Sequence, residues 1–220
     1  MNDLWGPLWL SLRIATVATI VAGLVAIPMA MLMSRRRFIG KSLIECILVV
    51  PMVLPPTVIG YLIILWLGAR GLIGHWLYER FEYSIVFRFE GAALAAAIVA
   101  LPMFYLPAKA GFASVARELE ENARLLGANR WQVFWQVTLP LARRGLNSGL
   151  VLAFARALGE FGATMMVFGW TPSRLTLPIS VYADYESGDL SHAAWAVGAM
   201  LILSFALIAA HNRSASSTQD

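Results

Sequence analysis

One carboxylate of this chain stands where it could do chemistry. Glu160 lies inside a long apolar stretch, four positions after Arg156. A charged group in such a segment is costly and is normally paired, and i,i+4 spacing places an Arg and a Glu on the same side of a helix. We therefore predict an ion pair between Arg156 and Glu160, with an architectural or gating role.

An intramembrane enzyme that uses this pair is an alternative interpretation. The chain has no second carboxylate, Ser/Lys pair or His pair at a matching position to serve as base or nucleophile. Its three histidines lack the spacing of metal ligands, and its one cysteine, Cys46, supports neither a disulfide nor a thiolate cluster. We expect no catalytic residue and no bound metal. The histidines are His75, His192 and His211.

The composition is that of a membrane protein. Hydrophobic residues make up 59% of the 220 residues and charged residues 14%, against about 45–50% and about 25% in soluble domains. The length suits one domain over residues 1–220. The net charge is +4, but the basic residues gather in loops between apolar segments. This distribution indicates a topology signal and argues against nucleic-acid binding.

Five segments are long and apolar enough to cross about 30 Å of hydrocarbon as helices. They lie at about residues 8–34, 43–67, 91–111, 146–170 and 193–210. No short segments of alternating hydrophobicity recur, so a barrel is excluded. The predicted fold class is an all-α membrane protein with a membrane core at about residues 8–211. The first segment lacks the basic start and the cleavage site of a signal peptide, so we expect it to remain in the protein.

The Lys and Arg residues are distributed unevenly between the two sides. With five crossings, eleven of the 17 share one side. The positive-inside rule assigns that side to the cytoplasm and places the N-terminus outside and the C-terminus in the cytoplasm. The eleven are Arg35, Arg36, Arg37, Lys41, Lys109, Arg117, Arg124, Arg130, Arg143, Arg144 and Arg213.

Three segments outside the predicted spans have distinct characters. The outer segment 69–89 carries aromatic residues suited to the headgroup layer and indicates an interfacial helix. The polar tail 212–220 is expected to be disordered. The longest inner segment, 111–145, is typical of two short helices, because Gly127 can adopt positive φ to end the first and Pro140 should stop the second.

The second of these short helices, at about residues 129–137, carries large apolar side chains. They are costly to expose to water and are useful as anchors in a partner's groove. The side chains expected at the surface are Trp131, Val133, Phe134 and Trp135.

The spacing Glu121-x-Ala123-x3-Gly127-x9-Val137-x-Leu139-Pro140 resembles the E-A-A-x3-G-x9-I-x-L-P signature of permease subunits of binding-protein-dependent ABC importers. Asn122 and Val137 stand where Ala and Ile are usual, and both are mild departures. The resemblance implies that the loop inserts a coupling helix into a nucleotide-binding subunit. The alternative is an amphipathic loop that only lies on the bilayer. The ATPase-coupling residues so implied are Glu121, Ala123, Gly127, Trp131, Phe134, Trp135, Leu139 and Pro140.

Further stretches resemble the molybdate group of oxyanion importers, with sulfate and thiosulfate permeases as the next relatives. They are residues 50–60, 155–166 and 176–182, so the resemblance covers nearly the whole chain. Tungstate has the same charge as molybdate and nearly the same size, and we do not expect it to be excluded.

The prolines of the second predicted span suggest a wall of a transport pathway. Pro51, Pro55 and Pro56 lack N–H donors and should break the helix, and the freed carbonyl groups must then face protein or a water-filled cavity. A packing kink without contact to substrate is the alternative. Small residues near Glu160 would allow close helix approach. The pathway and gating candidates are Pro55, Pro56, Thr57, Arg156, Gly159, Glu160, Gly162 and Thr164.

The resemblance also implies an assembly in the lipid of the bacterial inner membrane. Two copies of the chain would form the pathway by alternating access, each docked on an ATPase subunit, and a periplasmic binding protein would deliver the oxyanion. The chain has no Gly-rich phosphate loop with Lys and Ser/Thr, so ATP would be bound and hydrolysed on the partner and this chain would hold no cofactor. A passive oxyanion channel is the alternative.

Overall fold

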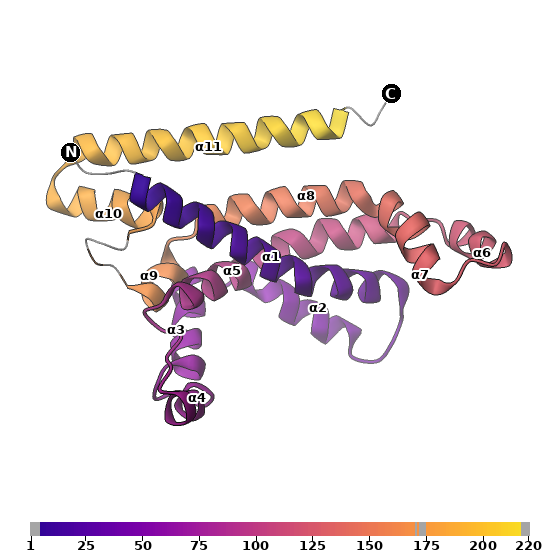
Figure 1. The fold of residues 1–220 in the computed structure, drawn as a ribbon, viewed down its shortest axis with the longest axis horizontal. Coiled ribbons are helices and arrows are strands. Elements are labelled where there is room, and N and C mark those ends of the chain that lie inside the picture. Colours follow the sequence, from indigo (N-terminus) through magenta and orange to yellow (C-terminus); the bar gives the residue numbers. More distant parts are fainter. Residues whose placement is uncertain (1–4, 170, 172–174, 217–220) are drawn as a thin grey trace.

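The computed structural model describes residues 5–169, 171 and 175–216. Its elements are all helices among the described residues, in agreement with the predicted class. Four long helices run side by side along the long axis of the molecule (Figure 1). The centre consists of three of them, while the fourth lies at the edge. The three are α1 (Trp5–Arg35), α5 (Phe89–Ala113) and α8 (Leu139–Leu158), and the fourth is α11 (Leu190–Ser216).

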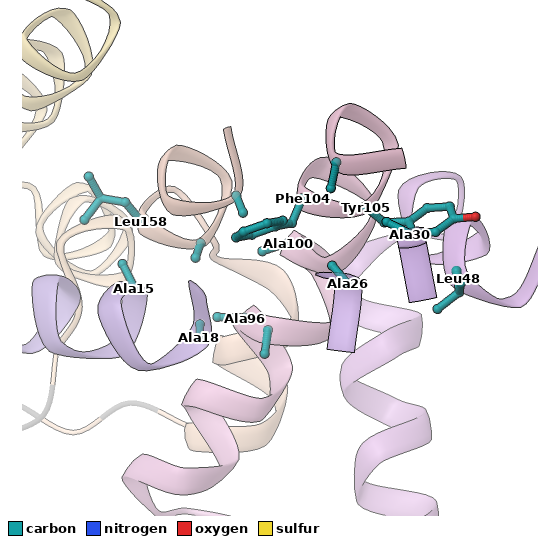
Figure 2. Packing of buried hydrophobic residues seen from close by; sticks show 14 of the residues in the cluster. Ala15, Ala18, Ala26, Ala30, Leu48, Ala96, Ala100, Phe104, Tyr105 and Leu158 are labelled. Atoms are coloured by element: carbon teal, nitrogen blue, oxygen red, sulfur yellow. The ribbon is translucent and has the colours of Figure 1, made fainter. Parts of the chain in front are cut away.

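The centre is built from small side chains. Buried alanines recur along one face of α1 at every third or fourth position, and they meet alanines of α5 (Figure 2). Because lipid is as apolar as a leucine side chain, these helices associate through close van der Waals contact, which small residues permit. The alanines of α1 are Ala15, Ala18, Ala22, Ala26 and Ala30.

Glycines bring α5 and α8 into backbone contact. A Cβ atom at Gly145 would lie 2.4 Å from the carbonyl oxygen of Pro107 and 2.7 Å from the Cα of Gly111. About one turn further along α8, a Cβ atom at Gly149 would lie 2.7 Å from the carbonyl oxygen of Phe104. Gly145 and Gly149 therefore form a G-x-x-x-G pair, a pattern that lets two helix backbones approach closely. The sequence interpretation did not single out this pair.

The second predicted span, residues 43–67, consists of two helices. The chain passes from α2 (Lys41–Val49) through the 3₁₀ turn η1 (Val50–Met52) to α3 (Pro56–Leu67), whose direction differs by 113°. The predicted break at the prolines is thus confirmed, and its cause is the loss of backbone donors. α3 and the short α4 (Gly74–Phe81) project sideways from the bundle (Figure 1). α4 is the helix predicted within residues 69–89.

The fourth predicted span, residues 146–170, is also divided. α8 begins earlier than predicted and ends at Leu158, and α9 (Gly162–Phe168) follows after a bend of 58°. The predicted end at Trp170 lies outside the described residues. The short α10 (Leu177–Ser187) was not predicted. The N–H of Leu177 at its start donates to the Ser11 hydroxyl of α1 at 2.8 Å, a contact that no local pattern encodes.

Polar contacts hold the corner between α10 and α11. Nδ1 of His192 lies 2.5 Å from a carboxylate oxygen of Asp184. Asp189 accepts from the backbone N–H of His192 at 3.0 Å and from the Ser191 hydroxyl at 2.8 Å. These two hydrogen bonds lower the pKa of Asp189, and the bond from His192 has the larger effect. Both favour the charged form of the carboxylate. Asp189 thus starts α11 as an N-terminal cap.

By length and apolar character, α1, α5 and residues 190–209 of α11 can each cross a membrane. Two further crossings are possible if each bent pair of helices, residues 41–67 and residues 130–168, counts as one span. The number of candidate crossings is then the predicted five. α1 begins near one end of the long axis, and α11 runs from that end toward the other (Figure 1), as an odd number of crossings requires. The tail differs from the prediction, because residues 212–216 continue α11. They contain neither Gly nor Pro to interrupt the helix.

Replacing Gly145 by Ala should destabilise the protein, because the new Cβ atom would overlap the backbone of α5. Overpacking of this kind costs about 1–3 kcal/mol and would appear as a lower thermal unfolding temperature in detergent. Gly198→Ala in α11 is the matched control, since a Cβ atom there meets nothing within 4 Å. Equal unfolding temperatures for G145A and the unmodified protein would contradict the close contact between α5 and α8.

Candidate functional site

The inner segment 111–145 contains the predicted tight turn. α6 (Arg117–Leu125) is followed two residues later by Gly127, whose φ is +92°, a conformation that favours glycine. The N–H groups of Gly127 and Ala128 donate to the carbonyl oxygens of Arg124 and Ala123, each at 3.0 Å. This pair of bonds is a Schellman motif, which satisfies the last carbonyls of a helix. It gives Ala123 and Gly127 a structural role in the turn, whereas Glu121 is exposed.

The next helix, α7 (Arg130–Val133), begins with a capping box. The Asn129 side chain accepts from the Gln132 N–H at 2.9 Å, and the Gln132 side chain accepts from the Asn129 N–H at 2.7 Å. Two otherwise unpaired donors are thereby satisfied. The turn and the box together set the direction in which α7 leaves α6.

The predicted stop at Pro140 is wrong. The chain runs from α7 through the π-helical turn η2 (Phe134–Thr138) directly into α8, and Pro140 is the second residue of α8. A proline ring collides with the carbonyl four residues earlier in an α-helix. Here the N–H of Leu139 donates to the carbonyl of Phe134, five residues back, and this wider turn accommodates the proline. Leu139 is half-buried at the junction.

Two aromatic side chains of this region face outward. Trp131 is 71% exposed and Trp135 is 58% exposed. The predicted exposure of Val133 is wrong, because it is 3% exposed, and Phe134 is half-buried against the central cluster. The rings of Trp131 and Trp135 each meet Phe134 edge-on, with centroids 6.5 and 5.4 Å away. Successive helical residues point in different directions, so Trp131 and Trp135 form the exposed surface and Phe134 supports it.

The break before α3 and the break before α9 lie next to each other, and α3 packs on α9. A Cβ atom at Gly162 would lie 3.1 Å from the Cβ of Pro56 and 3.3 Å from the Cγ2 of Thr57. A Cβ atom at Gly60 would lie 2.6 Å from the Cβ of Met166. The predicted role of Gly162 in close helix approach is confirmed. Gly60 was missed, although a glycine inside an apolar helix is itself a signal of close packing.

Glu160 joins the two sides of the break between α8 and α9. Its side chain is 1% exposed, and its Oε2 lies 2.8 Å from Nη1 of Arg156. Its Oε1 accepts from the N–H of Ala163 at 2.8 Å. The predicted ion pair is confirmed, and the carboxylate also satisfies a donor at the start of α9, where a helix favours negative charge. Gly159, at the end of α8, is exposed.

Thr164, a predicted pathway donor, is buried in this conformation. It is 1% exposed, because α9 packs between α3 and α5. Its hydroxyl therefore does not reach the surface in this conformation. Pro55 and Thr57, by contrast, are exposed where α3 begins. Of the predicted pathway residues, the structure brings Pro56, Thr57 and Gly162 into contact, and Thr164 is buried two positions further along α9.

The two groups of residues occupy different parts of the bundle. α6 and α7 lie at one end of the long axis, whereas α3 and α9 lie toward the other (Figure 1). Within the part of the chain that the structure describes, no group of three or more His, Cys, Asp or Glu side chains could hold a metal ion. The arrangement combines an exposed aromatic surface, formed by Trp131 and Trp135, with a bent joint between helices.

A family model described as binding-protein-dependent transport system inner membrane component matches residues 22–213. This chain belongs to that family. It is therefore a membrane subunit of a transport system rather than an enzyme, and its location is the inner membrane, as predicted.

Relatives and a solved structure are similar to it over most of its length. The putative molybdenum transport system permease protein YvgM of Bacillus subtilis is 38% identical over 94% of this chain and 92% of its own length. The molybdenum transport system permease protein ModB of Escherichia coli is 41% identical over 81% of this chain and 78% of its own. A bacterial alginate ABC transporter, solved in complex with a periplasmic protein, covers 97% of this chain and 78% of its own with a TM-score of 0.73 and 14% identity. This last likeness concerns the fold alone.

Replacing Glu160 by Ala should impair folding or assembly before it alters anion preference. The change leaves the partly exposed Arg156 cation and the buried Ala163 N–H without their partner, and a buried donor without an acceptor costs about 1–3 kcal/mol. Glu160→Gln keeps an acceptor for Ala163 and should lose less. The yield of monodisperse protein and its thermal unfolding temperature measure the effect. Normal stability and transport rate with a switched anion preference would contradict this role.

Proposed function

We propose that this chain is the permease subunit of an ATP-driven molybdate importer. The observation that carries the proposal is the similarity to two molybdenum permeases over most of the chain. Tungstate would share the pathway, since its charge is the same and its size nearly so. Sulfate and thiosulfate are the competing oxyanions.

A second copy of the chain would complete the pathway. α3 projects from the bundle and carries large exposed apolar side chains next to the proline break. Lipid could cover these side chains, but it cannot satisfy the backbone carbonyls that the prolines leave without donors, which need protein or water. This need supports a homodimer with the breaks at its interface. The exposed side chains are Val58, Tyr61, Leu62, Leu65 and Trp66.

The tryptophans Trp131 and Trp135 would anchor each permease copy in a groove of an ATPase subunit. Large aromatic side chains at the centre of an interface commonly dominate its binding energy. ATP would be bound and hydrolysed on that subunit, so this chain would need no cofactor of its own. On the opposite side of the membrane, a periplasmic binding protein would deliver the oxyanion.

The continuity of the helices supports a mechanism of alternating access. Residues 130–158 form one helical segment from the docking surface to the Glu160 joint. Beyond that joint, α9 packs on α3, so a rotation of α8 would shift both breaks together. ATP-driven closure of the ATPase subunits would in this way expose the pathway outward, and nucleotide release would return it inward. The chain contributes two conformations rather than bond chemistry.

Reconstitution tests the substrate and the energy source. The permease, its ATPase subunit and its binding protein are placed in proteoliposomes, and uptake of radiolabelled molybdate is measured. Uptake should require hydrolysable ATP, and molybdate and tungstate should compete better than sulfate. Equilibration without ATP would indicate a passive channel. Stronger competition by sulfate than by molybdate would contradict the proposed substrate.

Replacing Trp131 and Trp135 together by Ala should prevent co-purification of the ATPase subunit. An interface anchor of this kind contributes about 2 kcal/mol or more, which is about 30-fold in affinity for each side chain. Trp195→Ala is the matched control, because Trp195 is 72% exposed but lies in α11, and it should leave binding unchanged. Normal binding by the double variant would favour a loop that only lies on the bilayer.

A further inference from the structure

Glu120, a residue outside the importer signature, fastens the loop to the first helix. Nη2 of Arg35 donates to Oε1 of Glu120 at 2.8 Å, and the Thr138 hydroxyl donates to the same oxygen at 2.6 Å. Arg35 and Glu120 are largely buried, and Thr138 is 1% exposed. One carboxylate oxygen therefore joins the last residue of α1, the helix α6 and the last residue of η2.

Arg35 has two further contacts with the same loop. Its Nη1 donates to the carbonyl oxygen of Val115 at 3.2 Å, and its own carbonyl oxygen accepts from Nη2 of Arg117 at 3.1 Å. Hydrogen bonds between ionised partners are stronger than neutral ones, and partial burial reduces competition from water. The end of α1 is thus held by the start of the loop and by Glu120 at the same time.

The position of Thr138 shows why this attachment matters mechanically. The π-helical turn η2 lies between the exposed tryptophans and α8. Its wider ring, and the N–H that Pro140 lacks, make η2 the place in this segment where a helix bends most readily. A displacement at Trp131 and Trp135 would be absorbed there unless the end of η2 is fixed to something else. The Thr138 hydroxyl is fixed to Glu120, and through it to α1.

We propose that Arg35, Glu120 and Thr138 form a clamp that makes the loop move as one body with α1 and α8. The inference rests on the proposed function, in which a displacement enters at the exposed tryptophans. Glu120 is then a positioning residue, which acts through the loop and does not touch substrate or nucleotide. Loosening the clamp should leave ATPase docking intact and uncouple ATP hydrolysis from transport.

Two near-isosteric substitutions weaken the clamp, one at the donor Thr138 and one at the acceptor Glu120. Thr138→Val removes the hydroxyl donor, and Glu120→Gln removes the charge while keeping an acceptor. Thr138→Ser restores the hydroxyl and should behave as the unmodified protein. Glu118→Gln is the matched control, because Glu118 lies on the same helix and is exposed.

The first measurement is independent of transport. Spin labels at positions 37 and 125, both exposed, are introduced in a Cys46→Ser background of the full-length permease in lipid nanodiscs. The distance distribution between the labels should broaden in T138V and E120Q and should stay narrow in T138S and E118Q. If both clamp variants have the same width as E118Q, the clamp does not hold the loop and the proposal is overturned.

The second measurement is the amount of molybdate transported per ATP hydrolysed by the complete transporter in proteoliposomes. T138V and E120Q should retain the ATPase subunit and its hydrolysis, and transport per ATP should fall below that of T138S and E118Q. If a variant has a broadened distance distribution but an unchanged amount of molybdate transported per ATP, the clamp does not couple hydrolysis to transport and that role is overturned. Absence of ATP-driven uptake by the unmodified transporter would refute the proposed function instead, and the spin-label distances would still decide whether the clamp exists.

Discussion

Close packing of small residues among α1, α5 and α8 is the constraint on which the rest of the structure depends. Alanines and glycines occupy the facing surfaces, and at Gly145 even one added carbon would meet the backbone of α5. In lipid this short-range packing replaces the hydrophobic effect as the force that joins helices. The bent elements and the inner loop are attached to this centre, α9 through α5 and the loop through the end of α1.

The two helix breaks lie beside the contact between α3 and α9, and the first remains partly exposed at Pro55 and Thr57. A break inside lipid leaves backbone groups without partners, which is costly in hydrocarbon. Here one break follows prolines and the other is joined by Glu160, and α3 and α9 pack on each other next to them. A bundle whose interruptions touch can shift between two arrangements without opening its packed centre, which is the property that a transport subunit requires.

The inner loop combines rigid and adaptable parts. The Schellman turn at Gly127 and the capping box at Asn129 define its shape, and the Glu120 contacts hold it against α1. The π-helical turn that follows accommodates Pro140 and connects the exposed tryptophans to α8. A displacement at the tryptophans therefore has a continuous physical route into the bundle.

Sequence spacing by itself determined the all-α membrane class, the approximate spans, the proline break, the Gly127 turn and the Arg156–Glu160 pair. Each depends on composition or on residues within about five positions of one another, whose mutual placement follows from helix geometry. Tertiary structure alone decided the burial of Val133 and Thr164, the continuation of the helix past Pro140, and the formation of α10. It also decided the bonds between Arg35 and Glu120, which lie 85 residues apart in the chain. Such contacts depend on which helix faces meet, and helical periodicity within one segment does not specify its neighbours.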